Sequence, residues 1–251
     1  MQENEALFSR HLRLASWGRE MQDLVSRTSV LLVGAGGTGG LMAELIVRSG
    51  FGSLTLVDMD YVSISNVQRQ VLFTAGDVGE PKAEVAERKL SAIGSGTKLT
   101  CIPEEFSPEN ATTLVSGADL VVECTDSLEA AMVANDACVK LGKPLVHMSA
   151  IEEYGQIKAY TPGLTSCLAC FMPESLPELP TCSQIGVLAS VPSLVSAMAF
   201  SVLLNVLRRR DDGALYFVDA RELSVQKVRV ERNVNCRACA RGDYIHLRRR
   251  P

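Results

Sequence analysis

Short apolar segments and longer amphipathic segments follow one another along the first half of this chain. The wholly apolar runs at 30–33 and 54–57 have the length of buried strands, whereas residues 40–48 between them place apolar side chains at helical spacing. Alternating strands and helices are typical of an α/β fold with a mostly parallel sheet and helices on both faces. The same pattern continues, predicting helices at about 81–91, 108–115 and 128–141 and strands at 98–102, 120–122 and 144–148.

The turn between the first strand and the first helix is rich in glycine. It reads Gly34-Ala35-Gly36-Gly37-Thr38-Gly39, and Asp58 follows the second strand. In a Rossmann-like unit the first glycine permits a tight turn, the second lets the backbone approach a phosphate, and the last lets helix and strand pack closely. An acid about 20 residues further on can bond a ribose. The pattern predicts a nucleotide site and leaves open hydride, methyl and nucleotidyl transfer.

The second half of the chain predicts a less regular structure. Residues 156–160 alternate as an edge strand does, and 192–207 form a buried helix that starts at a proline. Residues 214–218 and 224–230 predict a late antiparallel pair of strands. The prolines at 173–180 break regular structure and predict a mobile loop at about 171–190.

Because no long linker interrupts the pattern, we expect a single domain. It spans 1–251, with a helical arm at 1–27, a nucleotide-binding half at 28–150 and a second half at 151–251.

The composition is that of an ordinary globular protein. Of 251 residues 47% are hydrophobic, and the formal net charge is −4, which disfavours nucleic-acid binding and polybasic membrane contact. The N-terminus is polar and lacks the basic and apolar regions of a secretory signal. The longest apolar run, 187–207, contains Pro192 and Asn205, so a buried helix fits it better than a membrane span. We therefore expect a cytoplasmic protein with no nucleic-acid and no membrane partner.

Eight cysteines in a chain without such a signal indicate metal or redox chemistry before disulfides. Four of them form two Cys-x-x-Cys pairs, Cys167 with Cys170 and Cys236 with Cys239. Two such pairs supply the four soft ligands of a tetrahedral zinc site if the fold brings them together. A metal bound by four cysteines has no open coordination position, so we predict a structural Zn²⁺ that fastens the C-terminal segment. Two redox dithiols or inert buried cysteines are the alternatives.

Polar and basic residues that could bind phosphates come after the second strand. Asp60 lies close to Asp58, Asn66 and Arg69 belong to the segment at 65–70, and Lys82 lies in the first turn of the next predicted helix. Converging cations stabilise charge on a transferring phosphorus and its leaving group. Taken alone, however, Lys82 is more simply a solvated surface charge.

An acid also follows a third strand. Asp126 comes after the apolar run at 120–122, and Ser127 is placed to cap the helix that begins at 128. Because the carboxyl ends of parallel strands meet at one edge, we expect Asp126 to face the same edge as Gly36 and Asp58.

These motifs occur together and in one order. They are Phe8-Ser9-Arg10-His11, the glycine turn, Asp58-Met59-Asp60, Ser65-Asn66-Val67-Gln68-Arg69-Gln70, Val78-Gly79-Glu80-Pro81-Lys82, Glu123-Cys124-Thr125-Asp126 and the two cysteine pairs. From about residue 5 to 240 the chain resembles the adenylyltransferases of the ubiquitin-activating enzyme superfamily, of the MoeB, ThiF and HesA type.

The resemblance implies ATP-dependent adenylation of a carboxylate. In this family a carboxylate, usually the C-terminal glycine of a ubiquitin-fold sulfur carrier protein, attacks the α-phosphate of ATP and releases pyrophosphate. By matching positions, Asp58 would bond the ribose, and Asn66, Arg69 and Lys82 would bind the phosphates. Asp126 would hold Mg²⁺.

Two further residues take their roles from the same resemblance. Arg10 would reach the phosphates bound to a neighbouring subunit, which implies a symmetric homodimer with Arg10 donated in trans. Cys182 aligns with a cysteine that some members use for a thioester or persulfide link. No His, Lys or Arg stands beside it in the sequence to activate the thiol, so an unreactive loop cysteine is the alternative.

One segment departs from the family. Where sulfur-carrier activators have a glycine-rich start and a Gln-Ala-x-Glu motif, residues 192–200 contain neither Gln nor Glu. This departure opens a second substrate class, a small-molecule or peptide carboxylate such as an iron-guanylylpyridinol-type precursor. An NAD-dependent dehydrogenase would leave the cations and the paired cysteines without a role. A non-catalytic scaffold would not explain Arg69, Lys82 and Asp126.

Overall fold

The computed structural model describes residues 2–172 and 185–248. Its strands are β1 (Ser29–Val33), β2 (Ser53–Val57), β3 (Lys98–Ile102), β4 (Leu120–Glu123), β5 (Leu145–Ile151), β6 (Tyr154–Tyr160), β7 (Ala214–Asp219) and β8 (Ser224–Arg229). They form one sheet in the order β3-β2-β1-β4-β5-β6-β7-β8. The first five strands in this order are parallel, and the pairs from β5 to β8 are antiparallel. The predicted α/β class with late antiparallel strands is confirmed.

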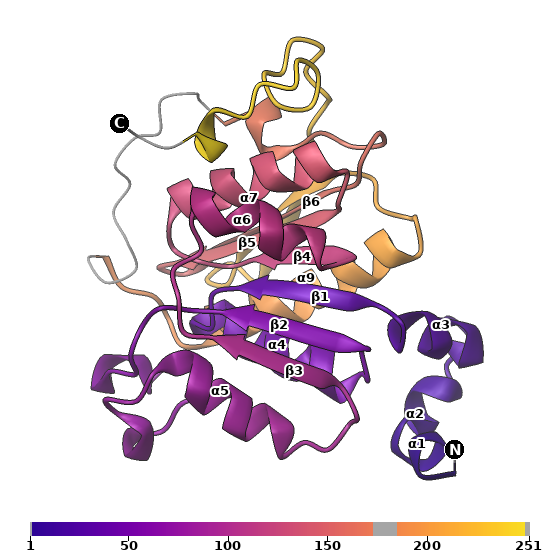
Figure 1. The fold of residues 1–251 in the computed structure, drawn as a ribbon, viewed down its shortest axis with the longest axis vertical. Helices are drawn as coiled ribbons and strands as arrows, with labels where there is room; N and C mark the ends of the chain where they lie inside the picture. Colours follow the sequence, from indigo (N-terminus) through magenta and orange to yellow (C-terminus); the bar gives the residue numbers. More distant parts are fainter. Residues whose placement is uncertain (1, 173–184, 249–251) are drawn as a thin grey trace.

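Helices cover both faces of the sheet (Figure 1). The helices α4 (Gly37–Arg48), α5 (Lys82–Ser91) and α9 (Ser190–Leu207) pack on one face, and α6 (Pro108–Ser116) and α7 (Leu128–Leu141) pack on the other. Each face encloses its own cluster of buried apolar side chains. The sheet is therefore the middle layer of three. The helices cover its faces, so a site can lie where the strands begin or where they end.

Strand β1 contributes to both clusters. Val30 and Leu32 belong to the cluster under α4 and α9, and Leu31 and Val33 belong to the cluster under α6 and α7. Successive side chains of a strand point to opposite faces, so a central strand covered on both sides needs an apolar residue at every position. This explains why the sequence of β1 is a continuous apolar run.

Strand β6 is not the edge strand that its alternating sequence predicted. It pairs with β5 through Leu145 and Tyr160 and with β7 through Gly155 and Val218. The edge is β8, two strands further on, where five of the six residues are exposed. The alternation was misleading because Lys158 is 1% exposed and bonds backbone carbonyls inside the molecule.

The N-terminal arm is helical, as predicted, but it consists of three short helices, α1 (Gln2–Leu7), α2 (Ser9–Leu12) and α3 (Gly18–Val25). The arm lies at the edge of the sheet where the parallel strands begin (Figure 1). Phe8 packs on Gly50 so closely that a Cβ there would lie 2.3 Å from Phe8 Cζ. This contact fixes the arm far from the carboxyl ends of the strands.

Within the described residues, α9 alone has the length and apolar composition to cross a membrane. It packs on α4, β5 and β6, and Val191, Val195 and Leu203 are fully buried. As predicted, α9 is a helix of the core. The mobile loop predicted at about 171–190 falls mainly on residues 173–184, which lie outside the described residues, and so does Cys182.

Candidate functional site

The carboxyl ends of β1, β2 and β4 meet at one edge of the sheet, and the glycine turn lies there. In register, Val33 pairs with Val57 on one side and with Glu123 on the other. Helix α4 begins from this turn, so the free N–H groups and the positive dipole end of its first turn face the same edge. A helix N-terminus of this kind binds phosphate.

The glycines of the turn are required for different steric reasons. Gly34 has a φ of 94°, a conformation that favours glycine. A Cβ at Gly39 would lie 2.0 Å from the Gly34 carbonyl oxygen, so no side chain fits between the helix and the turn. A Cβ at Gly37 would lie 3.1 Å from Pro192 Cβ on α9, whereas a Cβ at Gly36 would meet only one atom within 4 Å. The backbone at Gly36 is therefore the open part of the turn.

Asp58 fastens the glycine turn to the end of β2. Its Oδ2 accepts a hydrogen bond from Ala35 N at 2.6 Å, and its Oδ1 accepts one from Asp60 N at 2.9 Å. Burial raises the pKa of Asp58, while the nearby Lys82 ammonium and the two N–H donors act against that rise. The residue expected to bond a ribose thus already lies against the turn.

Lys82 is a buried residue at the same carboxyl ends of the strands. Its side chain donates from Nζ to Asp60 Oδ2 at 2.8 Å, and its backbone N donates to the Asp60 carbonyl at 2.9 Å. Lys82 is only 5% exposed, so its interpretation as a solvated surface charge is wrong. A buried ammonium with an exposed acid as its partner can serve a bound anion.

Asn66 is the last residue of the short 3-10 helix η1 (Ile64–Asn66), and Arg69 follows it. Asn66 is buried, and its Oδ1 accepts a hydrogen bond from Ser63 N at 3.0 Å. Arg69 donates from Nη1 to the Ser65 carbonyl at 2.9 Å. A Cβ at Gly37 would lie 3.8 Å from Arg69 Cγ, which places Arg69 beside the glycine turn.

Gln70 is a neighbour of the turn that the sequence alone did not single out. It is 4% exposed, and its Nε2 would lie 3.8 Å from a Cβ at Gly36. Its Oε1 is buried and has no hydrogen-bond partner among the described residues. The Gln70 amide therefore has an unused hydrogen-bond acceptor next to the backbone of Gly36. A polar ligand bound at this place would supply the missing hydrogen bond.

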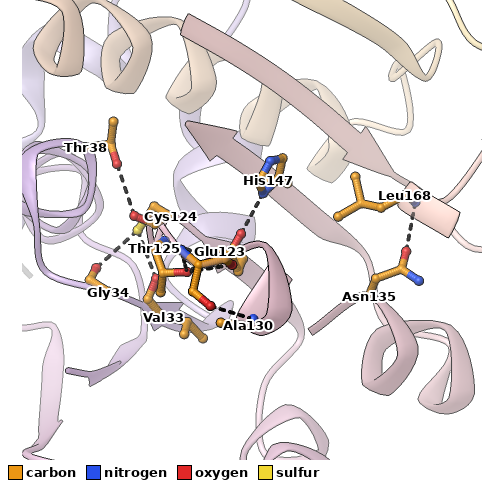
Figure 2. Close-up of polar contacts among 11 residues, drawn as sticks. Val33, Gly34, Thr38, Glu123, Cys124, Thr125, Ala130, Asn135, His147 and Leu168 are labelled. Atoms are coloured by element: carbon orange, nitrogen blue, oxygen red, sulfur yellow. Dashed lines mark hydrogen bonds and ion pairs between the residues drawn. The ribbon is translucent and has the colours of Figure 1, made fainter. Parts of the chain in front are cut away.

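A buried hydrogen-bonded pair, Glu123 and His147, holds the turn that carries Asp126 (Figure 2). Glu123 ends β4, and its Oε2 lies 2.6 Å from His147 Nδ1. Its Oε1 accepts hydrogen bonds from Thr125 N at 2.8 Å and from Thr125 Oγ1 at 2.6 Å. Thr125 Cγ2 would lie 3.2 Å from a Cβ at Gly34. The exposed Asp126 is therefore carried at the same edge as Gly36 and Asp58, as expected.

The thiol of Cys124 belongs to the scaffold of this edge. Its Sγ donates to the Val33 carbonyl at 3.0 Å and to the Gly34 carbonyl at 3.1 Å (Figure 2). Burial raises the pKa of Cys124 well above its usual value. A thiol that stays protonated in this way is a hydrogen-bond donor and a poor nucleophile.

Arg10 is not brought to the glycine turn of its own chain. It is an exposed residue of α2, in the arm that Phe8 fixes to Gly50. Helix α4 separates Gly50 from the turn, and its 12 residues span about 18 Å. The arm therefore lies at the amino ends of the parallel strands, and the glycine turn lies at their carboxyl ends.

The two cysteine pairs meet at a second site. The Sγ atoms of Cys167, Cys170, Cys236 and Cys239 all lie within 4.8 Å of one another. The separations are 3.9 Å within the first pair and 3.7 and 3.5 Å between the pairs. Sulfurs bound tetrahedrally at the usual Zn–S distance lie about 3.8 Å apart, so the cluster fits a zinc ion.

Two cationic side chains, Lys158 and Arg232, lie close to these sulfurs. Lys158 donates from Nζ to the Ser166 carbonyl at 2.9 Å and to the Ala159 carbonyl. Burial lowers the pKa of Lys158 to about 8, against the opposing effect of acids and thiols nearby. Arg232 donates from Nη2 to the Cys239 carbonyl at 2.8 Å. If a divalent metal binds here, such cations would offset the net negative charge of its four thiolate ligands.

Comparison with known proteins identifies relatives along nearly the whole chain. A sequence model of the ThiF family matches residues 8–238. The sulfur carrier protein adenylyltransferase of Thermus thermophilus is 37% identical over 247 residues, which cover 94% of this chain and 90% of that protein. The SAMP-activating enzyme E1 of Haloferax volcanii is 32% identical, with 94% of this chain and 88% of that protein covered. The Drosophila sechellia adenylyltransferase and sulfurtransferase MOCS3 is 33% identical, and this chain spans 54% of its length.

Solved structures share the fold. Escherichia coli MccB with MccA-N7isoASN superimposes with a TM-score of 0.81 at 22% identity, covering 94% of this chain and 74% of that chain. At this level of identity the similarity concerns the fold alone. The family model and the Thermus relative confirm the resemblance that the motifs carried, and the chain belongs to the ThiF family.

Proposed function

We propose that this protein is an ATP-dependent adenylyltransferase whose substrate is the C-terminal carboxylate of a ubiquitin-fold sulfur carrier protein. The observation that carries the proposal is the buried Lys82 ammonium at the edge where the open backbone of Gly36 lies. A fixed cation beside a phosphate cradle suits the transfer of a charged phosphoryl group. A dehydrogenase has no use for it, and a scaffold without catalysis would not need to bury it.

The reaction requires little covalent chemistry from the protein. An oxygen of the substrate carboxylate attacks the α-phosphorus of ATP, a new P–O bond forms, and the bond to the departing pyrophosphate breaks. The carboxylate is already ionised at neutral pH, so no general base is needed. The protein's task is to position the reactants and to neutralise charge on the leaving group.

Each proposed ligand of ATP has a place at the edge. Asp58 bonds the ribose, the N–H groups of the glycine turn face the phosphates, and Asn66, Arg69 and Lys82 neutralise them. Asp126 would hold Mg²⁺, which would supply positive charge beside the leaving group. Within its own chain, Arg10 lies at the amino ends of the strands, far from the glycine turn. We therefore propose a homodimer in which Arg10 acts on the partner's site.

The relatives support the carrier as substrate, since the Thermus protein and a Bacillus subtilis protein 35% identical over 198 residues are both named for adenylation of sulfur carrier proteins. The absence of Gln and Glu from residues 192–200 favours a second candidate, a peptide or small-molecule carboxylate. We also assign a structural Zn²⁺ to the four cysteines. A cytoplasmic location, the single domain and a transfer role for Cys182 remain predictions.

Exchange of labelled pyrophosphate into ATP tests this function. We expect exchange that requires a carrier protein ending in Gly-Gly and that disappears when the carrier lacks its last glycine. Exchange with a peptide or a small carboxylate, and none with the carrier, would show that the substrate is a peptide or small-molecule carboxylate and not a carrier protein. If the protein binds ATP but shows no exchange with any acceptor, adenylation itself is contradicted.

A further inference from the structure

Two adjacent polar residues of α7, Asn135 and Asp136, are fully buried although neither belongs to the nucleotide edge or to the cysteine pairs. Buried polar groups are costly unless they are hydrogen-bonded. Helix α7 packs on both η3 (Leu168–Cys170), which contains Cys170, and η4 (Ile245–Leu247), which follows the second cysteine pair in the chain. Both residues find their partners in and around these two cysteine pairs.

Asn135 bonds the first pair. Its Oδ1 accepts a hydrogen bond from Leu168 N at 2.8 Å (Figure 2), and Leu168 directly follows Cys167. Its Nδ2 donates to Asp136 Oδ1 at 3.1 Å. The amide therefore fixes the backbone just after the first sulfur and is itself fixed by its neighbour.

Asp136 bonds the second pair. Its Oδ2 accepts a hydrogen bond from Arg237 Nη1 at 2.8 Å, and Arg237 directly follows Cys236. Arg237 is 7% exposed, and the same Nη1 also donates to the Asp243 carbonyl at 3.0 Å. Asp136 Oδ2 further accepts from His246 N at 3.2 Å. One carboxylate thus holds the second pair and the chain beyond it.

We propose that Asn135 and Asp136 are positioning residues for the metal and make α7 the common support of both cysteine pairs. The inference rests on the proposed Zn²⁺. In each pair the anchored residue is the one directly after the first cysteine, Leu168 through its backbone N–H and Arg237 through its side chain. The pairs lie 69 residues apart, and their joint contact with α7 brings them together before any metal binds.

Groups that orient metal ligands without touching the metal commonly change affinity by 10–100-fold when they are replaced. We expect an effect of this size from Asp136→Asn, which leaves Arg237 without its carboxylate, and from Asn135→Ala. Because Asp136 also holds His246, its replacement should in addition expose the segment after Cys239 to protease.

Zinc-loaded wild type, both variants and the control Asp23→Asn, an exposed acid on α3, are titrated with a chelating dye. The expected result is zinc affinity about 10–100-fold weaker for the two α7 variants and unchanged for the control. Trypsin should also cleave Asp136→Asn faster after Arg241. ATP binding, measured in parallel, should not change.

Equal zinc affinity in wild type and in both α7 variants would overturn the inference and leave the proposed zinc site standing. Wild type that holds no zinc would overturn both. If Asp136→Asn does not fold, the double variant Asp136→Asn/Arg237→Gln, which leaves no unpaired charge, takes its place. Circular dichroism is used to check that this variant folds. Zinc binding weaker than in wild type then supports the inference, and unchanged zinc binding overturns it.

Discussion

Glu123 Oε2 lies 2.6 Å from His147 Nδ1 across the neighbouring strands β4 and β5. The other carboxylate oxygen of Glu123 accepts hydrogen bonds from N and from Oγ1 of Thr125, the residue before Asp126. A buried pair inside the sheet therefore fixes an exposed turn at the proposed nucleotide edge.

Removing one partner of this pair should be costly. His147→Ala leaves a fully buried carboxylate oxygen without its partner, and we expect a loss of about 3–5 kcal/mol in the free energy of unfolding. Urea unfolding measures it. The double variant Glu123→Gln/His147→Leu should lose less, because it buries no charge. A single variant as stable as wild type would show that the pair does not support the turn.

Two glycines of the turn should respond differently to alanine. Gly39→Ala places a Cβ 2.0 Å from the Gly34 carbonyl oxygen, so the turn must open and the protein should melt at a lower temperature. Gly36→Ala meets only Gln70 Nε2, at 3.8 Å, and should fold normally while it binds ATP more weakly. Thermal melting and calorimetric titration with ATP separate the two effects. Normal ATP binding by folded Gly36→Ala would place the phosphates elsewhere.

Lys82→Ala should reduce kcat/KM for pyrophosphate exchange by about 10²–10³-fold, the usual effect of removing one group that stabilises transition-state charge. Lys98→Ala, which removes an exposed lysine of β3, is the matched control and should leave the rate unchanged. Asp60→Asn keeps the ammonium and should have a smaller effect than Lys82→Ala. An exchange rate for folded Lys82→Ala near that of wild type would remove this residue from the mechanism.

Donation of Arg10 in trans can be tested by mixing two inactive proteins. An Arg10→Ala chain paired with a Lys82→Ala chain contains one complete site. After subunit exchange, an equal mixture of the two should therefore recover about a quarter of wild-type activity, from half of the dimers with one working site each. Pyrophosphate exchange is the measurement. Activity that stays at the level of the separate variants would contradict donation between subunits.

Features encoded by short spacing could be predicted from the sequence. The positions of Gly34 and Gly39 follow from the turn between one strand and one helix, and their steric environment agrees with the roles expected of them. Each Cys-x-x-Cys pair also fixes its own local geometry, although the meeting of the two pairs depended on the fold.

Features that depend on distant contacts could not be predicted. His147 lies 24 residues from its partner Glu123, so the local sequence of neither residue predicts the pair. Asp136 and Arg237 are 101 residues apart, and each alone has the sequence appearance of a surface charge. Lys158 misled the interpretation of β6 for the same reason, since its buried hydrogen bonds to carbonyls leave no trace in local sequence.

The most direct test of carboxylate adenylation is the intact mass of a carrier protein ending in Gly-Gly after incubation with this protein, ATP and Mg²⁺. We predict a carrier heavier by one AMP, together with release of pyrophosphate, and neither product with Lys82→Ala. A carrier that binds the protein in the presence of ATP but keeps its original mass, with no pyrophosphate released, would contradict the account.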